Sequence, residues 1–398
     1  MKIAIIADAR SEHTRRWVGY LAERDEVLLL STHPFGGTME AVKIVSLPKI
    51  FSAGNSIARS TQGNTGKGNL SARLISRSLL RLPIVWRLWQ SCSLADVFVQ
   101  GRSARREIER FRPDLVHAMR IQNEGYVAAL TRWHPFILSV MGNDFVYTAR
   151  HFLLHRIGTK KVVPLCDGIT ADCQRDLRLA GEFGLKPSAA REYFPSNGGV
   201  DLRVFSTGGE PNGRKREILY FRGISPLYRP ITLIKAVRIL TDRAEFADVV
   251  LHILAPTVSG PWFEEKRAKY GLPRENFKIG GFLAPPDLAR LLQEVAIVAS
   301  PTISDGTPNS MLEAMACGAF PVMSDLESNR EWIAAGENGL TFDPNDPQDL
   351  AAKLATALDD ISLRQEAQRI NYNIVRKRVD YGRVMPAVRQ FYQRLIKS

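Results

Sequence analysis

The chain has 398 residues, of which 45% are hydrophobic and 24% charged, so its composition is that of a globular protein and not of a disordered or fibrous one. No apolar run reaches the roughly 18 residues of a membrane-spanning helix, and we expect no secretory signal at the N-terminus. The 54 basic residues exceed the 41 acidic ones by 13, which indicates an anionic partner such as a nucleotide, a phospholipid surface or a nucleic acid.

Short β-branched runs alternate with amphipathic stretches along most of the chain. This alternation indicates parallel sheets covered by helices on both faces, and the twelve expected strands divide into two doubly wound α/β units. The helices between them include His13–Arg24, Ile231–Leu240 and Asp287–Glu294. The expected strands are Lys2–Ala7, Val27–Ser31, Lys43–Leu47, Asp114–Met119, Phe136–Met141, Gly168–Asp172, Ile218–Arg222, Val249–Leu254, Phe277–Gly281, Ala296–Ser300, Phe320–Met323 and Leu340–Phe342.

A turn-rich stretch at Pro195–Gly199 marks the expected boundary between the two units, beside a second polar loop at Ser206–Arg214. We predict an N-terminal unit over residues 1–196 and a C-terminal unit over residues 197–379. In two such Rossmann-like units facing a central cleft, ligands sit at the carboxyl ends of the strands, so the cleft is the expected active site.

One basic segment interrupts the alternation. Residues 50–112 carry eleven Lys and Arg against three acids. An apolar stripe at helical spacing runs through it beside a row of arginines. The stripe comprises Ile75, Leu79, Leu82, Trp86 and Trp89, and the row comprises Arg73, Arg77 and Arg81. Residues 70–112 can therefore lie on an anionic membrane surface, or the stripe can pack on the domain and leave the arginines solvated; both interpretations stay open.

Several familiar motifs are missing. The turn after the first strand has no G-x-G-x-x-G, which argues against a dinucleotide site there. His151 and His155 have the spacing of a zinc pair, but Phe152 stands where the glutamate is needed, so we expect no metal. The four cysteines form no C-x-x-C pair, which is typical of a reducing cytoplasm.

The most informative stretch is Ser300–Gly318, where a buried strand is followed by a loop and a helix. Pro308 suits the first helical position, so the first-turn amides would form an anion site. These amides belong to Asn309, Ser310, Met311 and Leu312. Asp305 and Glu313 flank this site and can accept hydrogen bonds from sugar hydroxyls; alternatively, they are a loop residue and a solvated helix residue.

A second basic element follows the first strand of the C-terminal unit. Arg222 ends that strand and Arg229 opens the next helix. Two guanidinium groups can bind a diphosphate and neutralise its charge as it leaves. Together with the helix after Pro308, they predict a pocket for a nucleotide diphosphate.

These residues resemble the retaining glycosyltransferases of family four, which have the GT-B fold. The resemblance covers nearly the whole chain and is strongest over residues 277–360. The similar stretches are Gly280–Phe282, Ser300–Pro301, Asp305–Gly318, Pro321–Val322 and Glu337–Leu340, with Asp114–His117, Gly142–Asp144 and Asn197–Asp201 in the first half.

The resemblance implies roles for particular residues. The family's paired glutamates correspond to Asp305 and Glu313, which places the chain in a subgroup with Asp at the first position. Arg222, Arg229 and Asp305 would be catalytic. Residues implied in donor binding are Gly223, Tyr228, Gly281, Phe282, Gly306, Thr307, Pro308, Asn309, Ser310, Met311, Leu312 and Glu313. On the acceptor side they are His13, His117, Asn143 and Asp144. A C-terminal helix at about 380–398 would pack back on the first domain.

We therefore expect an enzyme that moves a sugar from a nucleotide-diphosphate sugar to a hydroxyl with retention of the anomeric configuration. The expected setting is bacterial surface polysaccharide or lipid-linked glycan assembly, in the cytoplasm or at the inner membrane face, with no cofactor or metal. The enzymatic alternative is a nucleotide-sugar epimerase or a phosphorylase on the same scaffold. A nucleic-acid-binding protein is disfavoured, because the charge clusters in one segment and no nucleic-acid module is recognised.

Overall fold

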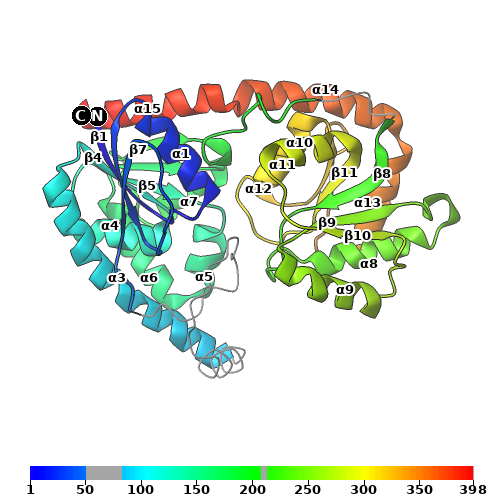
Figure 1. The fold of residues 1–398 in the computed structure, drawn as a ribbon, viewed down its shortest axis with the longest axis horizontal. Helices are drawn as coiled ribbons and strands as arrows, with labels where there is room; N and C mark the ends of the chain where they lie inside the picture. The colour runs from blue at the N-terminus through cyan, green and yellow to red at the C-terminus, as the bar shows by residue number, and fades with distance from the viewer. Residues whose placement is uncertain (51–82, 208–212, 398) are drawn as a thin grey trace. The chain divides into compact units, whose positions relative to one another are not determined.

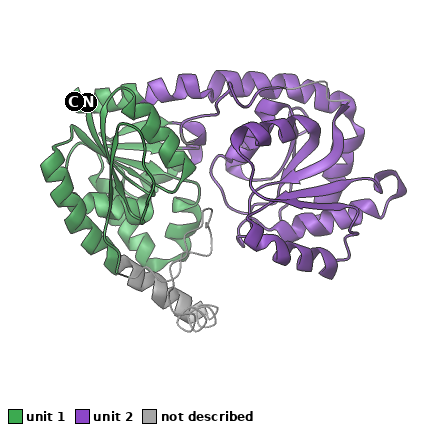
Figure 2. Cartoon of the chain, viewed as in Figure 1, with its two compact units in different colours: residues 1–171, 176–193, 389–398 green, residues 172–175, 194–388 purple. Residues whose placement is uncertain are grey.

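The computed structural model describes residues 1–50, 83–207 and 213–397 (Figure 1). The side chains of residues 83–94 and 197 lie outside this description. The predicted apolar stripe and arginine row over residues 73–89 therefore fall outside the described side chains, and the loop at 206–214 falls partly outside. The chain divides into two compact units (Figure 2): residues 1–171, 176–193 and 389–398 form unit 1, and residues 172–175 and 194–388 form unit 2.

Unit 1 is built on a parallel sheet whose seven described strands run in the order β3-β2-β1-β4-β5-β6-β7. The central strands β1, β4 and β5 are buried almost throughout, which explains their continuous apolar sequences. The strands are β1 (Lys2–Ala7), β2 (Glu26–Ser31), β3 (Val42–Ser46), β4 (Leu115–Met119), β5 (Phe136–Val140), β6 (Gly168–Ala171) and β7 (Ala190–Tyr193).

The sequence predicted six of these strands and missed β7. Its sequence, Ala-Arg-Glu-Tyr, has no apolar run because the strand lies at the edge of the sheet and is only half-buried. The backbone pairs β7 with β6, from Gly168 opposite Ala190 to Ala171 opposite Tyr193.

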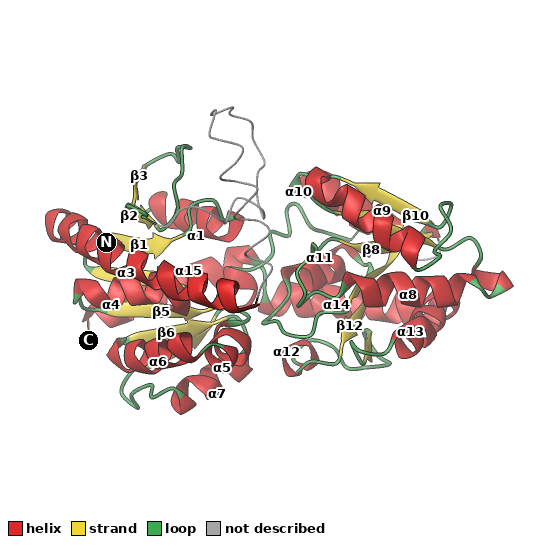
Figure 3. Ribbon diagram, turned by 90° about the horizontal axis from the view of Figure 1, so that it is seen from below, coloured by secondary structure: helices red, strands yellow, loops and turns green. Residues whose placement is uncertain are grey.

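Helices cover both faces of the sheet in unit 1 (Figure 3). Their buried faces and the strands share one apolar core that includes Ile6, Ile108, Val127 and Leu138. The helices are α1 (Glu12–Ala22), α3 (Pro83–Phe111), α4 (Tyr126–Thr131), α5 (Ala149–His151), α6 (Leu153–Val162) and α7 (Gln174–Glu182), which starts in unit 2.

Unit 2 has its own parallel sheet and its own core, which includes Ile218, Phe246, Phe263 and Val322. The six described strands run in the order β10-β9-β8-β11-β12-β13 and correspond to the six predicted ones. They are β8 (Lys215–Tyr220), β9 (Val250–Leu254), β10 (Phe277–Gly280), β11 (Val295–Ser300), β12 (Phe320–Ser324) and β13 (Leu340–Phe342). The helices are α8 (Pro230–Thr241), α9 (Gly260–Lys269), α10 (Pro285–Glu294), α11 (Asn309–Cys317), α12 (Glu327–Arg330), α13 (Pro347–Asp359), α14 (Ile361–Arg378) and α15 (Tyr381–Lys397), which ends in unit 1.

Each sheet has one place where the strand order reverses direction. In unit 1 it lies between β1 and β4, and in unit 2 between β8 and β11. At such a switch point the connections after the two strands leave toward opposite faces, which opens a crevice at the carboxyl ends of the strands. The loops after β1, β4, β8 and β11 are therefore the places to look for chemistry.

The end of α15 completes the core of unit 1 through a buried polar network. The Tyr392 hydroxyl accepts a hydrogen bond from Trp17 Nε1 at 2.9 Å and lies 2.6 Å from His117 Nδ1. On its other side, His117 Nε2 lies 2.7 Å from Ser139 Oγ. Burial lowers the pKa of His117 to about 3, so this ring stays neutral.

Candidate functional site

The switch point of unit 2 brings Arg222 and Asp305 into an ion pair. Arg222 follows β8 and Asp305 lies in the loop after β11, and the two loops are joined because the Ile303 amide donates to the Leu227 carbonyl at 2.9 Å. The Arg222 guanidinium also lies 4.6 Å from the centre of the Tyr228 ring. Its Nη1 is 3.5 Å from Ser310 Oγ in α11. Arg222, Tyr228, Asp305 and Ser310 thus form one cluster, which we call the Arg222 site.

The charges of this pair stabilise each other. Burial disfavours the charged guanidinium, but the neighbouring carboxylate of Asp305 and the hydroxyl of Tyr228 hold the pKa of Arg222 above its ordinary value. Arginine carries five N–H donors, so its guanidinium can contact Asp305 and a phosphate oxygen at the same time.

The loop that carries Asp305 is held from several directions. The Asp305 carbonyl accepts hydrogen bonds from Arg175 Nη1 at 2.9 Å and Ser328 Oγ at 3.0 Å. Next to it, the Thr307 hydroxyl donates to the Asp172 carbonyl at 2.5 Å. A side chain at Gly306 would displace the Asp172 carboxylate, so glycine permits this close approach. The loop therefore fixes the position of the Asp305 carboxylate.

The start of α11 differs from the sequence prediction. Pro308 is the residue before the helix and not its first residue, because its ψ of 120° is extended. Its carbonyl accepts the amides of Met311 at 3.1 Å and Leu312 at 3.3 Å, so these two of the four predicted amides already have a protein acceptor. The other two predicted anion-binding amides, those of Asn309 and Ser310, come before Met311 and Leu312 in the chain. Glu313 is half-buried on a helix that is otherwise buried from Ser310 onward.

Four other residues predicted on the donor side are not members of the Arg222 site, although Gly223 and Arg229 adjoin it along the chain. Arg229 is the residue before α8, has a φ of 42° and donates to Asn345 Oδ1 at 2.5 Å. Gly223 has a φ of 102°, which glycine accommodates, and its carbonyl accepts the Tyr220 hydroxyl at 2.6 Å. Gly281 and Phe282 follow β10, and Phe282 is 54% exposed.

Two of the predicted acceptor-side residues lie in the core of unit 1. His117 is fully buried with both ring nitrogens engaged, so we assign it a structural role in place of the predicted acceptor contact. Asp144 is also fully buried; it accepts hydrogen bonds from Arg120 Nε at 3.1 Å and the Ile121 amide at 3.0 Å. It joins the loops after β4 and β5 and positions them. His13, on α1, and Asn143, just before Asp144, are both partly exposed.

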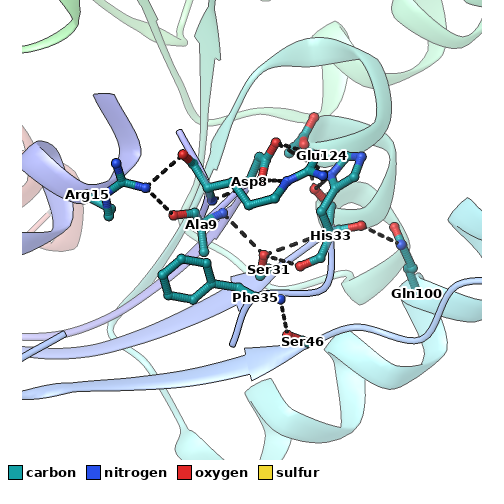
Figure 4. A network of polar contacts seen from close by, with 11 residues as sticks. Asp8, Ala9, Arg15, Ser31, His33, Phe35, Ser46, Gln100 and Glu124 are labelled. Atoms are coloured by element: carbon teal, nitrogen blue, oxygen red, sulfur yellow. Dashed lines mark hydrogen bonds and ion pairs between the residues drawn. The ribbon is translucent and has the colours of Figure 1, made fainter. Parts of the chain in front are cut away.

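The switch point of unit 1 holds a polar cluster that the sequence prediction missed (Figure 4). Asp8 follows β1 and accepts two hydrogen bonds of 2.9 Å from the Arg10 guanidinium. His33, after β2, places its Nδ1 3.8 Å from Asp8 Oδ2. Glu124, in the turn after β4, accepts the Thr32 hydroxyl at 2.7 Å. We call Asp8, Arg10, His33 and Glu124 the Asp8 cluster.

The electrostatics of the Asp8 cluster are unusual. Burial raises the pKa of Glu124 to about 7, against the opposing effect of Arg120. Burial together with the charge of Lys49 lowers the pKa of His33 to about 4. The turn that carries Glu124 is strained, because Asn123 has a φ of 72° and a ψ of −73°. A carboxyl that titrates near neutrality on a strained turn is suited to hold or transfer a proton.

Each member of the Asp8 cluster follows a buried strand, and this position was the available sequence signal. Asp8 comes directly after the first predicted strand, and Thr32 and His33 come directly after the second. Glu124 lies five residues past its strand, at the end of a turn, so only the folded chain brings it to the cluster.

Parts of the chain are similar in sequence to known proteins. Residues 206–374 match the family described as glycosyl transferases, group 1. Among curated proteins, the chain is 29% identical over 168 residues to the N,N'-diacetylbacillosaminyl-diphospho-undecaprenol alpha-1,3-N-acetylgalactosaminyltransferase of Campylobacter jejuni, covering 40% of each chain. It is 24% identical over 221 residues to the D-inositol 3-phosphate glycosyltransferase of Thermobispora bispora, covering 51% of this chain and 50% of that one. The matches thus span about half or less of these relatives.

Solved structures resemble the whole chain. Sucrose-phosphate synthase of Thermosynechococcus elongatus aligns with a TM-score of 0.76 at 13% identity, over 100% of this chain and 99% of that one. HepE of Anabaena, solved with UDP and glucose, aligns with a TM-score of 0.69 at 16% identity, over 99% and 100% of the two chains. These likenesses and the two parallel α/β units confirm the predicted GT-B fold. The match to the group 1 glycosyl transferases includes Arg222, Asp305 and all of α11.

Proposed function

We propose that this protein is a retaining glycosyltransferase of family four that uses a nucleotide-diphosphate sugar. The observation that carries the proposal is the Arg222–Asp305 pair beside the first turn of α11, at the switch point of unit 2. A cation, a hydroxyl and helix amides meet there, which is the chemistry that binds a diphosphate. The match of residues 206–374 to group 1 glycosyl transferases supports the same conclusion.

In this mechanism Arg222 stabilises the negative charge that grows on the diphosphate as the sugar leaves. The amides of Asn309 and Ser310 add dipoles of the same sign, and no side-chain nucleophile is required. The departing phosphate takes the proton of the acceptor hydroxyl, and the hydroxyl attacks the same face of the sugar. Asp305 holds the Arg222 guanidinium and accepts sugar hydroxyls, and Glu313 contacts the ribose. We propose that no metal takes part, so transfer should persist in EDTA.

For the acceptor, we propose a hydroxyl of a lipid-linked glycan in bacterial surface polysaccharide assembly, reached from the cytoplasm. The Campylobacter relative is named for a diphospho-undecaprenol acceptor, which supports this class. The Asp8 cluster is the acceptor-side site that we propose, because its carboxyl groups and imidazole can accept and donate hydrogen bonds to sugar hydroxyls.

Calorimetric titration of UDP, GDP and ADP tests the donor site. One nucleotide should bind with micromolar affinity, and Arg222→Ala should weaken its binding at least tenfold because a charge-assisted contact is lost. Arg376→Ala, at an exposed position on α14, is the matched control and should bind as the parent does. If no nucleotide binds, or if both variants bind equally, the proposed donor site is wrong.

The anomeric configuration of the product, read by NMR, tests retention. An inverted product would rule out the proposed mechanism. Conversion of the donor without any acceptor would favour the epimerase alternative, and release of a sugar phosphate on addition of inorganic phosphate would favour a phosphorylase.

A further inference from the structure

Helix α6 in unit 1 presents an apolar surface outward. Leu153 is 71% exposed, Leu154 46% and Ile157 44%, and Leu165 just beyond the helix is 44% exposed. These four residues lie within one short stretch of 13 positions in the sequence. A helix of a globular protein normally turns its apolar residues to the core, so this arrangement is reversed.

Other residues already occupy the inward, buried face of α6. Thr159 and Val162 are buried, and Gly158 lies so close to the Tyr126 ring that a side chain there would collide with it. The Tyr126 hydroxyl donates to the His155 carbonyl at 3.0 Å. The exposed leucines and isoleucine therefore have no place in the core, and the helix cannot bury them by rotating.

The outward face is also strongly basic. At 100° per residue, Leu153 and Ile157 lie along its centre, with Arg156 and Lys160 on one side and Lys161 on the other. All three cations are exposed, and the ten residues of α6 include no acid. Apolar residues at the centre with cations at the flanks are the pattern of a helix that lies in the interface of an anionic bilayer.

A cavity of about 380 Å³ adjoins this face. Its lining combines three cations with one acid and one aromatic ring: Arg150, Arg156, Lys160, Glu182 and Phe183. The acid only partly offsets the cations, since Glu182 lies 3.9 Å from Arg150 and is itself exposed. The cavity is large enough for a lipid phosphate, and two cations remain to bind it.

We propose that Leu153, Leu154, Arg156, Ile157, Lys160 and Lys161, which we call the α6 face, dock on an anionic lipid bilayer. The apolar side chains would enter the acyl boundary while the cations contact lipid phosphates. Among the described residues, no helix is long and apolar enough to span a membrane. The α6 face is separate from the basic segment at residues 70–112, and its docking does not depend on sugar transfer.

Vesicle flotation of the full-length protein tests the proposal. The protein should float with vesicles of phosphatidylcholine containing 30% phosphatidylglycerol (about a third anionic lipid) and much less with phosphatidylcholine alone. Lys160→Gln combined with Lys161→Gln should weaken binding about 30-fold, because each cation near an anionic surface contributes roughly fivefold. Leu153→Gln combined with Ile157→Gln should weaken it at least about tenfold.

Matched controls come from α14. Arg376 and Lys377 occupy its last turn, as Lys160 and Lys161 do in α6, and all four are exposed. Arg376→Gln combined with Lys377→Gln should leave vesicle binding unchanged. Ile361→Gln, at the first position of α14, is the control for Leu153, which begins α6. Unchanged circular dichroism and melting temperature would show that each variant is folded.

Three results would overturn the proposal. The first is an absence of flotation with anionic vesicles. The second is an equal loss of vesicle binding in the α6 variants and the α14 controls, which would place the membrane contact elsewhere. The third is a protein that sedimentation shows to be a dimer and that becomes a monomer on Leu153→Gln, because the α6 face would then join two copies of the chain.

Discussion

Arg222 and Asp305 show how two residues distant in sequence acquire a joint role. Each follows a buried strand, and the strands β8 and β11 are neighbours in the sheet, so their carboxyl ends meet. The sequence predicted both residues because Arg222 ends one recognisable apolar run and Asp305 lies in the loop between another and the next helix. It did not predict that they pair with each other, since pairing depends on the neighbourhood of the strands and not on the local pattern.

Replacing Arg222 by lysine should distinguish the effect of its positive charge on catalysis from the effect of its planar guanidinium. Lysine keeps the positive charge but is a point donor that cannot span Asp305 and a phosphate in a planar fork. We expect kcat to fall about 100-fold, the size of one lost transition-state contact. Steady-state kinetics with the nucleotide sugar identified by calorimetry would measure it. A rate within about threefold of the parent would contradict the assigned role.

Glu124→Gln should change how stability depends on pH. Burial raises the pKa of Glu124 from 4.5 to about 7, so between these values the folded state binds a proton that the unfolded state has lost. The free energy of unfolding therefore falls as the pH rises through this window. Above the window it is about 3 kcal/mol lower than below it. The glutamine keeps the hydrogen bond from Thr32 and removes this dependence.

Urea unfolding of the parent and the Glu124→Gln variant at pH 5 and pH 8 measures the difference. The variant should be the more stable of the two at pH 8, and its advantage should shrink toward pH 5. Equal pH profiles would show that Glu124 is solvated in the folded protein.

At the scale of elements, apolar runs decided what the sequence could predict. The buried strands and α11 were predicted because their sequences are continuous or periodic. The edge strand β7 lacks such a run, and α11 begins one residue later than expected because Pro308 is extended. The Asp8 cluster was missed because its members are ordinary loop residues until three strands bring them together.

The stability that the contact between the end of α15 and the rest of unit 1 provides should depend on one oxygen atom, that of the Tyr392 hydroxyl. Tyr392→Phe removes the hydroxyl that accepts from Trp17 and contacts His117, leaving buried polar nitrogens without it. We expect a loss of about 1–3 kcal/mol in the free energy of unfolding. Tyr372→Phe, on α14, is the matched control and should change stability by less than about 0.5 kcal/mol.

Urea unfolding followed by circular dichroism would measure both variants. A Tyr392→Phe protein as stable as the control would show that water replaces the hydroxyl. This network also explains why His117 was misassigned, because a histidine at a strand end gives no sequence sign of its buried partners.

At the scale of the whole molecule, the two units have separate cores, and the Arg222 site lies in unit 2. A ligand stabilises only the unit whose folded form it binds. We expect two unfolding transitions in calorimetry, and the nucleotide that binds should raise one of them by several degrees while the other stays fixed. A single transition, or an equal rise in both, would show that the units unfold together.

Residues 389–398 belong to unit 1, although residues 194–388 of unit 2 lie between them and the other parts of that unit. During synthesis, the Trp17 and His117 side chains therefore lack their contacts with the Tyr392 hydroxyl at first, because Tyr392 leaves the ribosome only after unit 2 has been made. Unit 2 can complete its core first, and the first half of the polypeptide must stay soluble with a gap in its interior until Tyr392 has been made. Nascent chains stalled before residue 389 should accordingly be far more sensitive to protease in unit 1 than released chains.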